Sequence, residues 1–268
     1  MGAALATHLV KSGWHVACVD INAKLGRELT DSLAPYASFF QANVSSYASQ
    51  ASMFDAVWRK WHRLDALCAN AGIVDRSSIY ILKHKKSEQV PPEPDLSCTD
   101  IVYKGVIYGT QLATHYMRQN TPPGGKIVAT GSVVALYPHS TYPEYSGAKA
   151  GVLQFMRTSA PVLKIKDDVN FNVVLPGIVP TAIIPKEMVE AVRPDFLTPI
   201  ATIVKAYEKF LSDDGLWGQA VECSVDRLIF SEQPGYLDGA YSKRATTVWD
   251  PLFQTMHHES SQLPDAIR

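Results

Sequence analysis

Short apolar runs that end in small or polar residues constrain the fold of this 268-residue chain more than any other feature. Such runs lead into Asn70, Ser132 and Gly177. Each has the length of a buried strand and stops at residues typical of a turn. Functional groups of an open α/β sheet gather where its strands end, so we expect Asn70 and Ser132 to face one crevice.

A tyrosine and a lysine four residues apart follow Ser132. Tyr145 and Lys149 open a predicted helix, and residues four apart share one helix face. A phenol has a reference pKa of about 10, which is too high for acid–base work near neutral pH. An ammonium about 4 Å away, at an effective dielectric constant near 20, stabilises the phenolate by roughly 4 kcal/mol, or about 3 pKa units. The spacing therefore predicts that Lys149 lowers the pKa of Tyr145.

This spacing alone is weak evidence, because a Tyr-x-x-x-Lys pattern arises by chance about 0.7 times in a chain of this composition. The pattern becomes specific in combination with other motifs, which are Asn70-Ala71-Gly72, Ser132 and Pro176-Gly177. Together these motifs resemble the short-chain dehydrogenase/reductase family, and within it the hydroxyprostaglandin-dehydrogenase-like group common in fungi. The resemblance runs from Gly2 to about residue 230.

The resemblance implies a single α/β domain with a Rossmann-type, doubly wound parallel sheet over residues 1–233, and a tail, residues 234–268, packed on the same domain. It further implies that Ser132, Tyr145 and Lys149 are catalytic. The cofactor-binding residues that it implies are Gly2, Asp20, Asn43, Val44, Asn70, Tyr145, Lys149, Ile178 and Thr181. A polar, proline-containing stretch over residues 83–95 is expected to be an exposed loop.

The choice of cofactor is predicted from Asp20. This residue ends an apolar run 18 positions after Gly2. An acidic residue about 20 positions after the glycine loop of a dinucleotide-binding unit accepts hydrogen bonds from the ribose hydroxyls and repels a phosphate there. We therefore expect NAD rather than NADP. Asp20 is also placed to cap a helix that starts near Ala23, and the sequence leaves that alternative open.

The beginning of the chain departs from the family. The family starts with a strand that leads into Thr-Gly-x-x-x-Gly-x-Gly, whose amides hold the pyrophosphate. Gly2 matches only the last glycine, so the first strand and part of the glycine loop are missing. A parallel sheet without that strand leaves backbone groups unpaired. Two hypotheses follow: the native protein is longer, or this chain is a truncated product with weakened cofactor binding.

A second departure lies in the predicted helix from Ser97 to Gln119, which the family uses for dimer packing. The family places an asparagine three positions before the glycine of this helix, where it bends the helix and anchors a water of the proton relay. Counted back from Gly105, that position holds Val102. A valine side chain binds no water, so we expect slower turnover or a relay through another water path.

Composition excludes several other classes of protein. A net charge of −1 gives no electrostatic basis for binding nucleic acid or a membrane surface, and no apolar run approaches the length of a membrane span. The four cysteines lie far apart without a histidine at metal-ligand spacing, so we expect no metal site and a reducing compartment. We expect a cytoplasmic protein and, by resemblance, a homo-oligomer, either a dimer or a tetramer.

These observations predict an NAD(P)-dependent dehydrogenase that interconverts a secondary alcohol and a ketone. Apolar residues after Gly177 are expected to form a lid over a bulky hydrophobic substrate. They are Ile183, Ile184, Met188, Val189, Val192, Phe196 and Leu197. Fungal relatives of this type suggest a terpenoid or polyketide alcohol. Because of the missing glycine loop and Val102, a catalytically impaired binding or scaffold protein remains the alternative.

Overall fold

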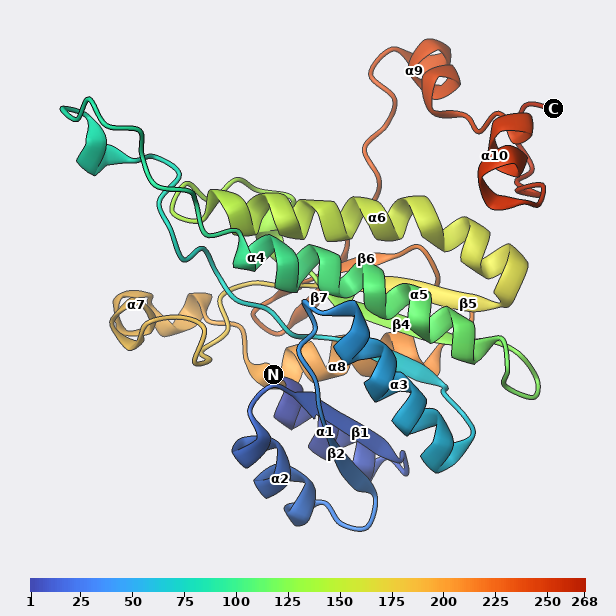
Figure 1. Cartoon of the computed structure of the whole chain (residues 1–268), viewed down its shortest axis with the longest axis horizontal. Coiled ribbons are helices and arrows are strands. Elements are labelled where there is room, and N and C mark those ends of the chain that lie inside the picture. The colour runs from blue at the N-terminus through green and yellow to red at the C-terminus, as the bar shows by residue number, and fades with distance from the viewer.

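Parallel strands alternate with helices along the chain, and the computed structural model describes all 268 residues (Figure 1). Five strands form one sheet in the order β3 (Ala66–Ala69), β4 (Gly125–Thr130), β5 (Val169–Pro176), β6 (Ala220–Ser224) and β7 (Arg227–Phe230). Within it only β7 runs antiparallel to its neighbour. A separate parallel ladder joins β1 (Val16–Asp20) to β2 (Ala37–Gln41).

Helices cover both faces of the five-stranded sheet, as a doubly wound α/β fold requires. One face carries α3 (Tyr47–Trp61), α5 (Gly105–Met117) and α6 (Pro143–Asp167), and the other carries α1 (Gly2–Lys11) and α8 (Ile200–Ser212). The remaining N-terminal helix, α2 (Ala23–Ser32), packs on β1 and β2. This arrangement confirms the predicted fold class.

Side chains of the central strands alternate between the two helical layers. In β4, Ile127 and Ala129 join the core beneath α5 and α6, whereas Val128 joins the core beneath α1 and α8. In β5, Val173 and Val174 divide between the same two cores. Successive residues of a strand point to opposite faces, so a strand covered on both sides must be apolar throughout. The continuous apolar runs of the sequence are therefore explained by burial on both faces.

The sheet is interrupted between β1 and β3. β1 pairs only with β2, and β3 pairs only with β4. A cavity of about 1030 Å³ opens between them, lined mostly by apolar residues that include both strands and Gly2 of α1. This interruption agrees with the expectation that the opening strand and part of the glycine loop are missing from the sheet.

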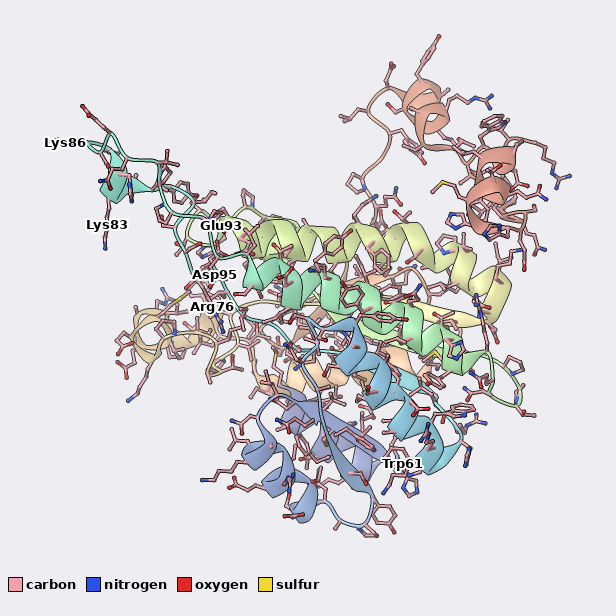
Figure 2. All side chains as sticks on the ribbon, in the orientation of Figure 1. Trp61, Arg76, Lys83, Lys86, Glu93 and Asp95 are labelled. Atoms are coloured by element: carbon pink, nitrogen blue, oxygen red, sulfur yellow. The ribbon has the colours of Figure 1, made fainter.

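An arm projects from the fold between β3 and α4 (Ser97–Thr99), and it carries the short 3-10 turn η1 (Leu82–His84) (Figure 1). Lys83 and Lys86 lie at its outer end, and Arg76 and Asp95 lie at its base (Figure 2). Almost every residue of the arm is exposed. This confirms the exposed loop predicted over residues 83–95.

The long helix predicted from residue 97 to residue 119 is a continuous helical run made of α4, the π-helical segment η2 (Asp100–Lys104) and α5. The predicted lid contains α7 (Lys186–Ala191) and the 3-10 turn η4 (Pro194–Phe196). Strand β7 was not predicted. No helix of the chain combines the length and the apolar character needed to cross a membrane.

The C-terminal tail forms two helices that the sequence did not predict, α9 (Gly239–Thr246) and α10 (Asp250–His257). They stand apart from the two helical layers, on the side of α6 that faces away from the sheet (Figure 1). Lys166 of α6 forms an ion pair with Glu259 at 3.1 Å. Within the tail, the Asp250 carboxylate accepts hydrogen bonds from the hydroxyls of Ser260 and Ser261, both at 2.6 Å. The tail is thus organised largely by polar contacts of its own.

The interrupted sheet predicts uneven local stability. Amides of β1 and β2 belong to a two-stranded ladder, whereas those of β4 and β5 lie inside the five-stranded sheet. Backbone bonds beside a cavity open at a lower free energy than bonds in a packed core. Native-state hydrogen exchange should therefore be at least tenfold faster at Cys18 and Phe40, whose N–H groups the parallel register places in the β1–β2 ladder, than at Val128 and Val173. Equal protection in the two ladders would contradict this account.

Candidate active site

Ser132 lies directly beyond β4, at the carboxyl edge of the sheet. Gly131 precedes it, and a Cβ atom there would come within 2.6 Å of the Leu175 side chain of β5. Only glycine therefore fits against the neighbouring strand. Ser132 is buried, and its Oγ accepts a hydrogen bond from the Val134 N–H at 3.3 Å, at the start of η3 (Val133–Ala135). The serine is fixed at the point where the strand turns away from the sheet.

Helix α6 carries Tyr145 and Lys149 on one side, as their spacing predicts. Lys149 is only 3% exposed. Its Nζ donates to the Thr130 carbonyl oxygen at 2.5 Å and lies 5.5 Å from the centroid of the Tyr145 ring. The Tyr145 side chain also lies close enough to Ser132 for the serine to act on its pKa. The structure thus brings Ser132, Tyr145 and Lys149 together at the end of β4.

Burial controls the pKa values of both ionisable groups. It lowers the pKa of Lys149 to about 8, and it raises the pKa of Tyr145, an effect that Ser132 opposes. The pKa of Tyr145 is thus raised in this structure, whereas the sequence predicted a lowered one. The cause is the removal of water, which penalises the charged form of each group. Near neutral pH the pair consists of a neutral phenol and an ammonium.

Thr130 connects this site to two further side chains. Its Oγ1 donates to Asn70 Oδ1 at 3.1 Å and pairs with the Tyr207 hydroxyl of α8 at 2.5 Å. Burial raises the pKa of Tyr207, so its hydroxyl keeps its proton and donates it to Thr130. This chain of hydrogen bonds orients the amide of Asn70, whose Nδ2 lies 3.0 Å from the position that a Cβ atom of Gly2 would occupy. The sequence predicted Asn70 but neither Thr130 nor Tyr207.

The cavity between β1 and β3 reaches four of the predicted cofactor residues. Gly2, Asp20, Val44 and Asn70 line it. Gly2 begins α1, whose first N–H groups have no side-chain cap, and such a helix start suits a phosphate group. The Asp20 carboxylate at the end of β1 suits ribose hydroxyls. These residues therefore fit a dinucleotide.

Asp20 does not cap the following helix. The N-cap of α2 is Asn22, whose Oδ1 accepts a hydrogen bond from the Leu25 N–H at 3.1 Å. Asp20 instead accepts the Asn22 N–H at 2.8 Å through Oδ1. The capping alternative is therefore wrong, because Asn22 supplies the acceptor. The hydrogen bond from the Asn22 N–H holds the Asp20 carboxylate at the mouth of the cavity.

Besides Tyr145 and Lys149, three predicted cofactor residues lie outside the lining of this cavity. Asn43 is exposed, and its Oδ1 accepts the N–H and the hydroxyl of Ser45 at 3.0 and 2.8 Å. The Ile178 carbonyl accepts the Thr198 N–H at 2.7 Å. Thr181 is half-buried between β5 and α7. A role for these three residues toward a cofactor stays a prediction.

Val102 lies in the π-helical segment η2 and is 1% exposed. Such segments distort a helix and are frequent at functional sites. A Cβ atom at Gly72 would lie 3.6 Å from Val102 Cγ2 and 3.7 Å from Lys149 Nζ. Val102 and Lys149 therefore both lie against Gly72. The helix is distorted where the family bends it, but valine provides no polar group there.

Two polar side chains beside the site make contacts that were not predicted. Gln50 Nε2 donates to the carbonyl oxygens of Val44 and Gly105 at 2.7 and 3.0 Å, and fixes the loop after β2 against α5. Asp75 accepts the backbone N–H of Tyr145 at 2.8 Å. Gly105 is 55 positions from Gln50, and Tyr145 is 70 positions from Asp75. No local sequence pattern reveals contacts over such separations.

Comparison with known proteins agrees with this geometry. The family model described as short chain dehydrogenase matches residues 1–190. The short-chain dehydrogenase/reductase prx6 of Penicillium rubens is 51% identical over 271 residues, which cover 100% of this chain and 91% of prx6. The short-chain dehydrogenase/reductase prx7 of the same fungus is 31% identical, over 89% of this chain and 92% of prx7. The NAD(+) 15-hydroxyprostaglandin dehydrogenase of Mus musculus is 31% identical, over 69% of this chain and 66% of that enzyme.

The chain belongs to the short-chain dehydrogenase/reductase family, and it is an oxidoreductase that acts on CH–OH groups. Its similarity to fungal members and to 15-hydroxyprostaglandin dehydrogenase confirms the resemblance seen in the sequence.

The buried ammonium predicts a specific pH dependence of stability. Lys149 has a pKa of about 8 in the folded chain, against 10.5 for an unperturbed lysine. Between these values the unfolded chain binds a proton that the folded chain has released, so the stability of the wild type rises with pH. The variant Lys149→Met lacks this rise. Its stability relative to the wild type should therefore fall by about 3 kcal/mol between pH 8 and pH 10.5.

Chemical denaturation across this pH range measures the difference. Lys186→Met is the matched control, because the Lys186 side chain is 87% exposed. The free energy of unfolding of the control should differ from that of the wild type by the same amount at every pH. A constant difference for Lys149→Met as well would contradict burial of the Lys149 ammonium.

Proposed function

We propose that the chain catalyses the NAD-dependent interconversion of a secondary alcohol and a ketone on a bulky apolar substrate. The observation that carries this proposal is the convergence of Ser132, Tyr145 and Lys149 at the end of β4. It places a hydroxyl, a phenol and an ammonium around one point at the edge of a parallel sheet, where such folds bind their ligands. Family membership supports the class of reaction.

Each of the three side chains has a defined part in the reaction. Ser132 holds the substrate oxygen through its hydroxyl, and Tyr145 exchanges a proton with that oxygen. Because burial keeps the phenol neutral, Tyr145 is ready to donate its proton to a ketone oxygen. In the opposite direction the phenol must first lose its proton, and the Lys149 ammonium 5.5 Å from the ring stabilises the resulting phenolate. A bound nicotinamide dinucleotide would supply the hydride chemistry.

NAD is the proposed cofactor. The Asp20 carboxylate, held by the Asn22 N–H at the mouth of the cavity, suits free ribose hydroxyls and disfavours a phosphate in their place. Gly2 offers the start of α1 to the pyrophosphate. The name of the mouse relative, which specifies NAD(+), supports the same choice.

The proposed substrate is a large hydrophobic alcohol. The segment between β5 and α8 contains exposed and half-buried apolar side chains, with Phe196 60% and Ile183 37% exposed. None of the residues of α7 is buried. Apolar side chains displayed on a short helix beside a site suit a lid that closes over an apolar ligand. The similarity to fungal enzymes supports a secondary metabolite, such as a terpenoid or a polyketide.

A catalytically impaired binding protein is the second candidate, and Val102 favours it because no polar group stands at the relay position. Titration of the protein with NADH, followed by nucleotide fluorescence, separates the two. Saturable binding supports the enzyme. Weak or absent binding supports the impaired protein.

Removal of the Tyr145 hydroxyl tests the assignment of the acid–base group. Tyr145→Phe should lower kcat about 10²–10⁴-fold, the usual contribution of a positioned acid or base. NAD binding should stay within about twofold of the wild type, because the lysine and the cavity are unchanged. Tyr116→Phe is the control, since Tyr116 packs against Phe54 and Trp58 on α3. Undiminished turnover in Tyr145→Phe would show that another group moves the proton.

A polar group at position 102 should speed the reaction. Val102→Asn places an amide against Gly72, where Lys149 also lies, and should raise kcat about tenfold, less than a complete acid–base group provides. The buried amide should also cost about 1–3 kcal/mol of stability. Val102→Ala, which removes bulk without adding a polar atom, should give no gain. Steady-state kinetics decide, and an unchanged kcat in Val102→Asn would show that the position is neutral.

A further inference from the structure

Helix α6, which carries the acid–base tyrosine, has no cap of its own. Its N-cap residue Tyr142 makes no side-chain hydrogen bond to the helix, and Pro143 has no N–H. The N–H groups of Glu144 and Tyr145 are therefore the first donors that need partners. Both are bound by Asp75, whose Oδ2 accepts the Glu144 N–H at 2.9 Å and whose Oδ1 accepts the Tyr145 N–H at 2.8 Å.

A second carboxylate, which belongs to α6 itself, accepts a backbone N–H group at the start of another helical run. The Glu144 side chain accepts the Thr99 N–H at 2.7 Å, at the start of the helical run that contains Val102. The N-cap residue of that run, Leu96, has no side chain able to accept a hydrogen bond. Asp75 and Glu144 thus join the loop after β3, the start of α4 and the start of α6.

The same carboxylates could be taken for a cation site, because oxygen atoms of Asp75 and Glu144 lie within 4.8 Å of each other and of Cys98 Sγ. The thiol of Cys98 donates to the Ile73 carbonyl at 3.1 Å, and its pKa is raised to about 12, mainly by burial. It therefore stays protonated. Both oxygens of Asp75 and one of Glu144 already accept backbone N–H groups. The cluster serves the protein backbone.

We propose that Asp75 is a positioning residue for Tyr145, acting through the backbone N–H of the tyrosine. This inference rests on the proposed function. Tyr145 lies in the first turn of α6, where helices fray, and a displacement of about 1 Å is enough to cost about 10²-fold in rate. Two hydrogen bonds from its N–H groups to the Asp75 carboxylate hold that turn. Lys149 lies one turn further in and is anchored separately to Thr130.

Because Tyr145 and Lys149 are held by different contacts, loss of the Asp75 carboxylate should affect only the tyrosine. Without Asp75, the tyrosine loses its fixed position while the lysine keeps its contact with the Thr130 carbonyl. Proton exchange should suffer, and binding of the alcohol and of NAD should not. A residue that only stabilised the fold would not separate kcat from KM in this way.

Asp75→Ala and Asp75→Asn test the proposal, with Asp167→Ala and Asp167→Asn as matched controls. Asp167 ends the same helix, and its carboxylate accepts two N–H groups of Arg118 at 2.7 and 2.9 Å. We expect kcat of Asp75→Ala to fall at least tenfold, with KM for the alcohol and for NAD within about threefold of the wild type. The kcat of Asp75→Asn should fall less, because the amide keeps one acceptor oxygen. The Asp167 variants should lose thermal stability at an unchanged kcat.

A kcat within twofold of the wild type in both Asp75 variants would overturn the proposal, as would an equal loss in the Asp167 variants. Where Asp75→Ala does not fold, Asp75→Asn decides. Hydrogen exchange at the amides of Glu144 and Tyr145, measured without substrate, gives a readout independent of turnover. It should accelerate at least tenfold in Asp75→Ala, and unchanged exchange would overturn the proposal. A wild type without turnover, but with this acceleration, would count against the proposed function and leave the cap established.

Discussion

The contact between the Lys149 ammonium and the Thr130 carbonyl is the interaction on which the site depends. It joins a side chain of α6 to the last residue of the central strand β4. Lys149 Nζ and the Thr130 carbonyl oxygen lie 2.5 Å apart, and Lys149 is buried away from water. Burial of an ammonium is unfavourable, and the lowered pKa of Lys149, about 8, expresses that cost. In return the contact fixes a cation beside Tyr145 and sets the distance between α6 and β4.

The parallel sheet determines where this contact can form. β4 is buried on both faces, so polar groups become available only where it ends, at Thr130 and Ser132. Gly131 allows the chain to turn there against β5. Asn70 reaches the same edge from β3 and is bound by Thr130. The interruption between β1 and β3 leaves the sheet from β3 to β7 intact, so the edge that carries the proposed site is formed although the cavity beside it is wide.

Local pattern predicted the strands other than β7 and the main helices, because each is encoded over a few adjacent positions. The spacing of Tyr145 and Lys149 specifies a shared helix face, for example. It does not encode the pKa of the tyrosine, which burial by distant segments raises. Asp75 and Tyr207 were missed for the same reason, since their partners lie 70 and 77 positions away. The tail helices also escaped prediction, because each has only 8 residues, too few for a periodic pattern to be distinguished.

The most direct test of this account is an NMR titration of the Lys149 side chain in the intact protein, with Lys149→Met used to assign the signal. If the ammonium is buried against the Thr130 carbonyl, it should titrate with a pKa of about 8. Titration near 10.5, as for a lysine in water, would place the group in solvent and contradict the account.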